Sequence, residues 1–101
     1  MDPDLPDFTI ADVVISTAGR DAGQLYYVIA ADETYLYLVN GKDRSLEKPK
    51  RQKRKHAQKV LRSETRVAQN LRSGDKVLDS ELRRDLATIS QELQSNADGG
   101  Y

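Results

Sequence analysis

The chain has 101 residues, of which 32% are charged and 38% hydrophobic, enough apolar material for one modest core in a single small domain. It has no cysteine, which excludes disulfides and thiolate metal sites, and no signal-like leader or membrane-spanning apolar run, so we expect a cytoplasmic protein. The net charge is zero, but residues 1–41, 42–62 and 63–101 carry −6, +8 and −2. This segregated positive charge is the feature to explain.

The first ten residues form an acidic leader, which we expect to be flexible because its prolines and aspartates offer little to bury. Phe8 and Ile10 are expected to anchor its end. Residues 11–62 are predicted to be the main domain. Their first three strands, favoured by β-branched and aromatic residues, are predicted at 12–16, 24–30 and 35–39.

The alternation of side chains along these strands predicts their faces. In the third strand we expect Leu36 and Leu38 to point inward. The second strand has apolar residues on both faces, so we expect cover on both sides, including from a C-terminal helix. Gly19 and Gly23, between the first two strands, are interpreted as turn residues.

Asn40 and Gly41 predict a two-residue hairpin turn that leads into a fourth strand at residues 45–47. Pro49 would end that strand, and residues 57–61 would form a fifth. Five short strands on a tight path predict a mainly β protein whose sheet closes into a small barrel.

The extension, residues 63–101, is predicted to be helical. A short helix should precede the turn at residues 73–75. A longer one, at about residues 80–94, should be capped by Asp79 or Ser80 and be ended by Asn96 and the glycines at 99 and 100. Its apolar stripe has spacings of four, three and four residues and consists of Leu82, Leu86, Ile89 and Leu93.

Nothing in the sequence favours catalysis. With one histidine and no clustered carboxylates, we expect no metal site, no cofactor and no small-molecule substrate. No Gly-Lys-Ser/Thr follows the glycines at 19 and 23, which argues against a phosphate-binding loop. We therefore predict a protein that is not an enzyme.

Between residues 48 and 55, seven of eight residues are Lys, Arg or Pro, and this unbalanced charge predicts contact with nucleic-acid phosphates. A solvated basic loop is the alternative. Arg20 and Asp21 are expected to pair with each other or with the turn backbone, or Arg20 to reach a phosphate. The tyrosines at 26, 27, 35 and 37 are expected either to pack in the core or to stack on unpaired bases. The candidate RNA-binding residues are Arg20, Lys42, Arg44, Lys48, Lys50, Arg51, Lys53, Arg54, Lys55, His56 and Lys59.

Five motifs in order resemble the bacterial KOW-domain RNA-binding protein family, which is related to KOW-bearing large-subunit ribosomal proteins of archaea and eukaryotes. They lie at residues 12–16, 18–23, 27–29, 40–44 and 49–56. The resemblance implies a five-stranded SH3-like barrel, followed here by the C-terminal helix. It also implies binding to RNA, in particular ribosomal RNA.

We therefore predict a ribosome-associated protein of translation whose segment 48–59 contacts the phosphates of structured RNA, with little sequence preference. Ribosomal proteins are further expected partners, and a membrane is not. The alternative is an adaptor of the translation or transcription machinery that docks proteins, as KOW domains of NusG-type factors do. DNA binding ranks third, because no helix suited to the major groove accompanies the basic segment.

Overall fold

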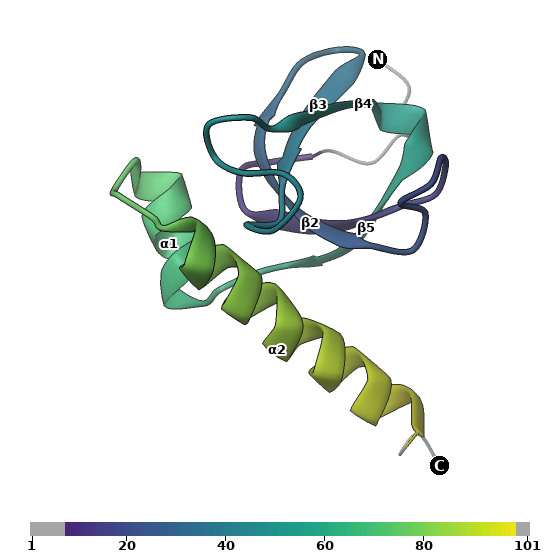
Figure 1. Cartoon of the computed structure of the whole chain (residues 1–101), viewed down its shortest axis with the longest axis vertical. Helices are drawn as coiled ribbons and strands as arrows, with labels where there is room; N and C mark the ends of the chain where they lie inside the picture. The colour runs from purple at the N-terminus through teal and green to yellow at the C-terminus, as the bar shows by residue number, and fades with distance from the viewer. Residues whose placement is uncertain (1–7, 99–101) are drawn as a thin grey trace.

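The computed structural model describes residues 8–98, and their side chains through residue 95. The leader at residues 1–7 lies outside this part. Five antiparallel strands form one sheet in the order β4-β3-β2-β1-β5, so the protein is mainly β, as predicted (Figure 1). Two helices follow the sheet in the chain. The strands are β1 (Asp12–Ser16), β2 (Leu25–Ala31), β3 (Tyr35–Val39), β4 (Lys50–Lys53) and β5 (Ala57–Arg62).

The sheet is buried on both faces. On one face Val14, Tyr26, Val28, Leu36 and Leu38 form a cluster with Phe8. On the other face Val13, Tyr27 and Val39 pack with residues of the helices. The predicted cover on both sides of β2 is therefore confirmed, as are the inward leucines of β3. Phe8 anchors the end of the leader, but the same prediction was wrong for Ile10, which is 41% exposed.

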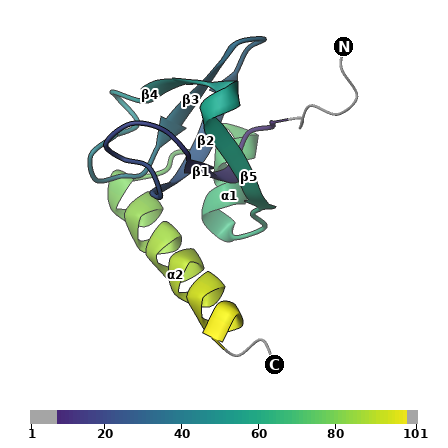
Figure 2. The ribbon, with the colours of Figure 1, turned by 90° about the vertical axis from the view of Figure 1, so that its right-hand side faces the viewer.

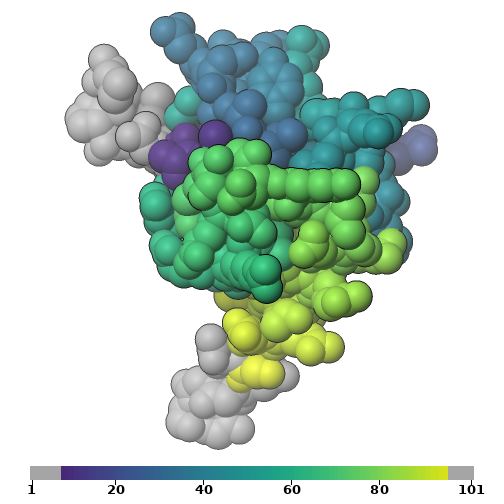
Figure 3. Space-filling view, turned by 90° about the vertical axis from the view of Figure 1, so that its left-hand side faces the viewer, coloured from purple at the N-terminus to yellow at the C-terminus, as the bar shows by residue number. Residues whose placement is uncertain are grey.

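Helix α2 (Asp79–Asp98) packs its predicted apolar stripe against the sheet, and its C-terminal end projects past the other elements (Figure 2). Leu82, Leu86 and Ile89 are buried, and Leu93 is half-buried. The shorter helix α1 (Arg66–Ser73) lies beside α2, and the two cover one side of the molecule (Figure 3). No helix in the described part of the chain is long and apolar enough to cross a membrane.

The helix ends use different caps. Thr65 caps α1 by accepting a hydrogen bond from the Ala68 amide, and Gly74 ends it in the left-handed conformation, which confirms the predicted turn. The predicted cap of α2 was wrong: Leu78 precedes the helix, and its amide donates to Glu81 Oε1 at 2.9 Å. The helix runs past Asn96 and ends at Asp98, and the glycines at 99 and 100, which were also predicted to end it, lie outside the described residues.

The predicted fourth strand was wrong as well. Residues 40–49 form a loop, and β4 begins only at Lys50. Asn40 Oδ1 accepts hydrogen bonds from the amides of Lys42 and Arg44 at 3.0 and 2.9 Å, which closes a longer turn than a two-residue hairpin. The Leu46 amide donates to Asp79 Oδ1 at 2.9 Å. Attachment to the start of α2 therefore holds this segment away from the sheet.

A buried polar cluster joins the sheet to both helices. The Tyr27 hydroxyl donates to the Asp85 carboxylate of α2 and lies 2.9 Å from Ser63 Oγ. Thr65 Oγ1 donates to the same carboxylate at 2.8 Å. Burial, followed by the hydrogen bond to Asp85, raises the pKa of Tyr27 to about 12. The cluster thus fixes α2 by directional bonds as well as by apolar packing.

Candidate nucleic-acid interface

The basic residues of β4 alternate between the two faces of the sheet. Lys50 is half-buried and Gln52 buried, whereas Arg51 and Lys53 are exposed. This is the ordinary period of a strand, in which successive side chains point to opposite faces. The sequence interpretation assigned all of these cations to phosphate contact, but only every second one reaches solvent on the outer face.

Lys50 points inward and is already paired. Its ammonium forms an ion pair with the Asp21 carboxylate and lies 5.5 Å from the centre of the Tyr26 ring. The Tyr26 hydroxyl donates to the same carboxylate at 2.7 Å. The hydrogen bond from Lys50 lowers the pKa of Asp21, and burial raises the pKa of Tyr26. Asp21 therefore pairs with Lys50, and the expected pair between Asp21 and Arg20 was wrong.

Gln52 connects β4 to β1 and to the residue that precedes β5, at the other side of the sheet. Its Nε2 donates to Ser16 Oγ of β1 at 3.1 Å and to the carbonyl oxygen of His56 at 2.5 Å. The same carbonyl accepts from the Thr17 amide at 2.9 Å. These bonds fix the inner side of β4, so its outer side chains stand on a rigid strand.

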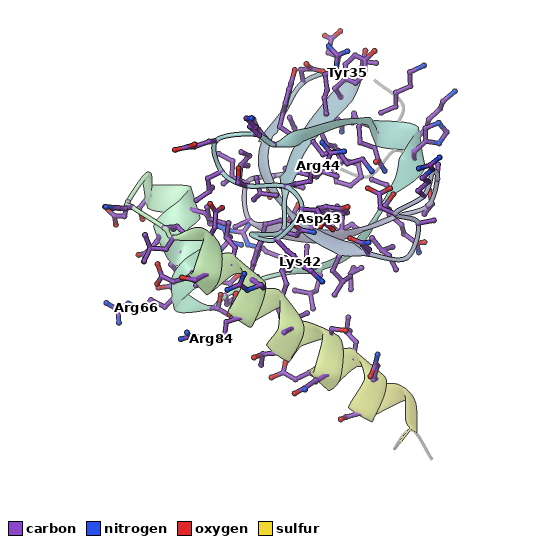
Figure 4. All side chains as sticks on the ribbon, viewed as in Figure 1. Tyr35, Lys42, Asp43, Arg44, Arg66 and Arg84 are labelled. Atoms are coloured by element: carbon purple, nitrogen blue, oxygen red, sulfur yellow. The ribbon has the colours of Figure 1, made fainter. Side chains whose placement is uncertain are left out.

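The outer side of β4 lies next to two tyrosines of β3. In the strand register Tyr35 is opposite Lys53, and Tyr37 is opposite Arg51. The Arg51 guanidinium carbon lies 4.5 Å from the centre of the Tyr35 ring, a cation–π contact. We call these four residues, Tyr35, Tyr37, Arg51 and Lys53, the Tyr35 face. Tyr35 lies at the end of the sheet away from α2 (Figure 4).

A 3₁₀ turn, Arg54–His56, follows β4 and presents one further exposed cation. The Arg54 guanidinium donates to the carbonyl oxygen of Asp32 at 2.8 Å and lies 5.2 Å from the centre of the Phe8 ring. The His56 side chain is half-buried, whereas Lys55 is exposed. Lys55 is therefore the residue of this turn best placed to meet a ligand.

Lys59 lies on the other edge strand of the sheet, β5. Its ammonium pairs with Asp12 at 3.1 Å, and the Asp12 carboxylate is itself buried. Asp12 Oδ2 also accepts a hydrogen bond from the Thr9 amide at 2.7 Å. Lys59 thus balances a buried negative charge, a structural role that the basic sequence pattern does not indicate.

The remaining predicted contacts lie on loops. Arg20 and Arg44 line one groove of about 550 Å³, together with Asp21, Asp43 and Lys50, so its charge is mixed. Lys42 and Lys48 are exposed on the loop before β4. Gly19 and Gly23 adopt φ of +82° and +94°, which confirms them as turn residues.

The sequence interpretation missed the acidic partners Asp12 and Asp21 and the contact between Arg51 and Tyr35. One signal was present: Gln52 interrupts the cations at the position that a strand would bury. Among the described residues, no group of three or more His, Cys, Asp or Glu side chains could hold a metal ion. A non-enzymatic role stays a prediction.

A scan against protein-family models and a search of curated proteins found no match to this chain.

Proposed function

We propose that this protein binds RNA through the exposed cations Arg51, Lys53 and Lys55. One observation carries the proposal: in the described part of the chain, no carboxylate forms an ion pair with any of these three, whereas Lys50 and Lys59 are paired with Asp21 and Asp12. Cations without a carboxylate partner, at every second position of a strand and the turn that follows it, are suited to a phosphate backbone.

The proposal also covers the fold type, the protein family and the kind of RNA that is bound. The bonds of Gln52 from β4 to Ser16 of β1 and to His56, which precedes β5, support an SH3-like barrel of the KOW type, because they draw the two ends of the sheet order toward each other. The sequence motifs support membership of the KOW-domain RNA-binding family. On that basis the RNA is ribosomal and the protein acts in translation in the cytoplasm.

Replacement of Arg51, Lys53 and Lys55 together by Gln tests this function. Three phosphate contacts predict a slope of log affinity against log salt of about −2 to −3, and the variant should lose that slope. The probe is a labelled RNA stem-loop, with affinity measured by fluorescence anisotropy across a salt series.

The matched control replaces Arg66, Arg83 and Arg84 by Gln, which removes the same charge from exposed positions on the helices. Arg66 and Arg84 lie far from the Tyr35 face (Figure 4). The control should bind RNA as the parent chain does. If both triple variants lose affinity equally, general charge rather than this surface explains the binding, and the proposal is wrong.

A protein-docking adaptor is the second candidate function. Ile10 is exposed and, with Ile29, Ala30 and Ala31, forms the apolar part of a depression of about 610 Å³ that Arg62 and Arg72 also line. Apolar docking there would respond weakly to salt, whereas RNA binding through cations falls steeply as salt rises. The same salt series, applied to co-purifying proteins, separates the two functions.

A further inference from the structure

The core does not require Tyr35 and Tyr37. In β3, Leu36 and Leu38 belong to one buried cluster and Val39 to the other, but neither tyrosine belongs to either cluster. Both tyrosine side chains are half-buried, and Tyr35 lies at the end of the sheet away from α2 (Figure 4). Burial in the core, one of the two roles expected for these residues, therefore does not account for them.

Exposed aromatic surface coincides with the unpaired cations. The other aromatic side chains in the described part of the chain, Phe8, Tyr26 and Tyr27, are 7%, 1% and 0% exposed. Within residues 8–95, no aromatic ring lies against the guanidinium of the exposed helix arginines Arg66, Arg83 and Arg84, whereas Arg51 contacts Tyr35. Solvent-accessible aromatic surface and cations without a carboxylate partner therefore occur together on the Tyr35 face.

The chemistry of this face fits an unpaired nucleotide. Aromatic rings and guanidinium planes stack on bases, and every base offers a π face regardless of sequence. In paired RNA the bases are stacked on each other, so a tyrosine ring gains little from a duplex. Arg51 and Lys53 lie directly across from the rings, where they would meet the phosphates on either side of a stacked base.

An acidic residue, Asp32, lies near this face: its Oδ2 accepts a hydrogen bond from the Tyr37 hydroxyl at 3.5 Å, and its Oδ1 serves the neighbouring turn. Asp32 Oδ1 accepts hydrogen bonds from the amides of Thr34 and Tyr35 at 2.9 and 2.7 Å. These bonds lower the pKa of Asp32. Asp32 thereby fixes the turn from which Tyr35 enters β3, and it holds the aromatic surface in place.

We infer that the Tyr35 face binds unpaired nucleotides of RNA, with a base stacked on the tyrosines and its flanking phosphates on Arg51 and Lys53. The inference rests on the proposed RNA binding and deepens it, because it names single-stranded or looped segments as the preferred target. A duplex would be held by the cations alone.

The experiment compares two double variants. Y35L/Y37L removes both rings but keeps apolar side chains, and Y35F/Y37F keeps the rings as the conservative control. Each is titrated with an unstructured RNA strand of about 12 nucleotides and with a fully paired RNA of similar length. Thermal unfolding monitored by circular dichroism verifies that both variants fold.

We expect Y35L/Y37L to bind the single strand about fivefold to a hundredfold more weakly than the parent chain, since base–aromatic stacking has that effect per base. Y35F/Y37F should bind it as the parent does, and the affinity for duplex should not change in either variant. Equal affinity of Y35L/Y37L and the parent for the single strand would overturn the inference, as would an equal loss on both RNAs.

These failures differ from a failure of the proposed function. If the tyrosine variants bind normally while the Arg51, Lys53 and Lys55 variant does not, the cationic RNA surface stands and base stacking is wrong. If the parent chain binds neither RNA at low salt, both proposals are wrong.

Discussion

Replacing Gly41 by alanine should destabilise this protein more than the same change at its other left-handed glycines. Gly41 has a φ of +74°, and a Cβ there would lie 2.0 Å from the Asp79 carbonyl oxygen and 2.9 Å from the Arg83 amide nitrogen. Both atoms belong to the backbone of α2, so no side chain can rotate away. The glycine allows the loop after β3 to touch the helix that covers the sheet.

The expected effect has two parts. A left-handed alanine costs about 1–2 kcal/mol at any such position. Forcing the first turns of α2 away from the loop adds about 1–3 kcal/mol of overpacking strain, because buried Leu82 and the bond between Leu46 and Asp79 move with the helix. Gly74 is the matched control: its φ is +78°, and a Cβ there meets nothing within 4 Å. Only the first part applies to it.

The assay is urea unfolding of both variants monitored by circular dichroism. G41A should be less stable than G74A by about 2 kcal/mol, a large share of the roughly 5–15 kcal/mol typical of small domains. In thermal unfolding the difference corresponds to about 10 °C. Equal stabilities would refute the reasoning, because they would mean that the loop and α2 do not touch at Gly41.

Two further predictions concern buried polar groups. Y27F should lose about 1–3 kcal/mol of unfolding free energy, since the Asp85 carboxylate would lose a buried donor; an unchanged urea midpoint would contradict this role. Lys50 lowers the pKa of Asp21 below 3.8, so the ionised carboxylate stabilises the fold above that pH, and the gain is lost as the pH falls through the lowered value. The stability difference between the parent and D21N should therefore be present at neutral pH and vanish in strong acid; a difference that persists in acid would exclude the ion pair as its source.

Local patterns were sufficient for much of the fold. The strands at 12–16, 35–39 and 57–62 and the stripe of α2 were predictable because side-chain periodicity is a property of neighbouring residues. Contacts that join distant segments were not. Asn40 and Gly41 suit a tight hairpin locally, but the loop instead follows α2, whose Asp79 accepts its hydrogen bond from Leu46. An aspartate at the start of a helix can cap that helix or accept a hydrogen bond from a distant loop, as Asp79 does, and the local sequence is the same in both cases.

For the candidate site, the sequence determined that a cationic segment exists and that tyrosines lie near it on strands. It did not determine which cations face solvent, because that depends on where β4 begins and on which carboxylates the fold brings within reach. Tertiary structure pairs Lys50 with Asp21 and Lys59 with Asp12, across 29 positions and 47 positions of the chain respectively. A charge is fully available to a ligand only if no carboxylate of the fold already pairs with it, and proximity of that kind is set by packing rather than by sequence order.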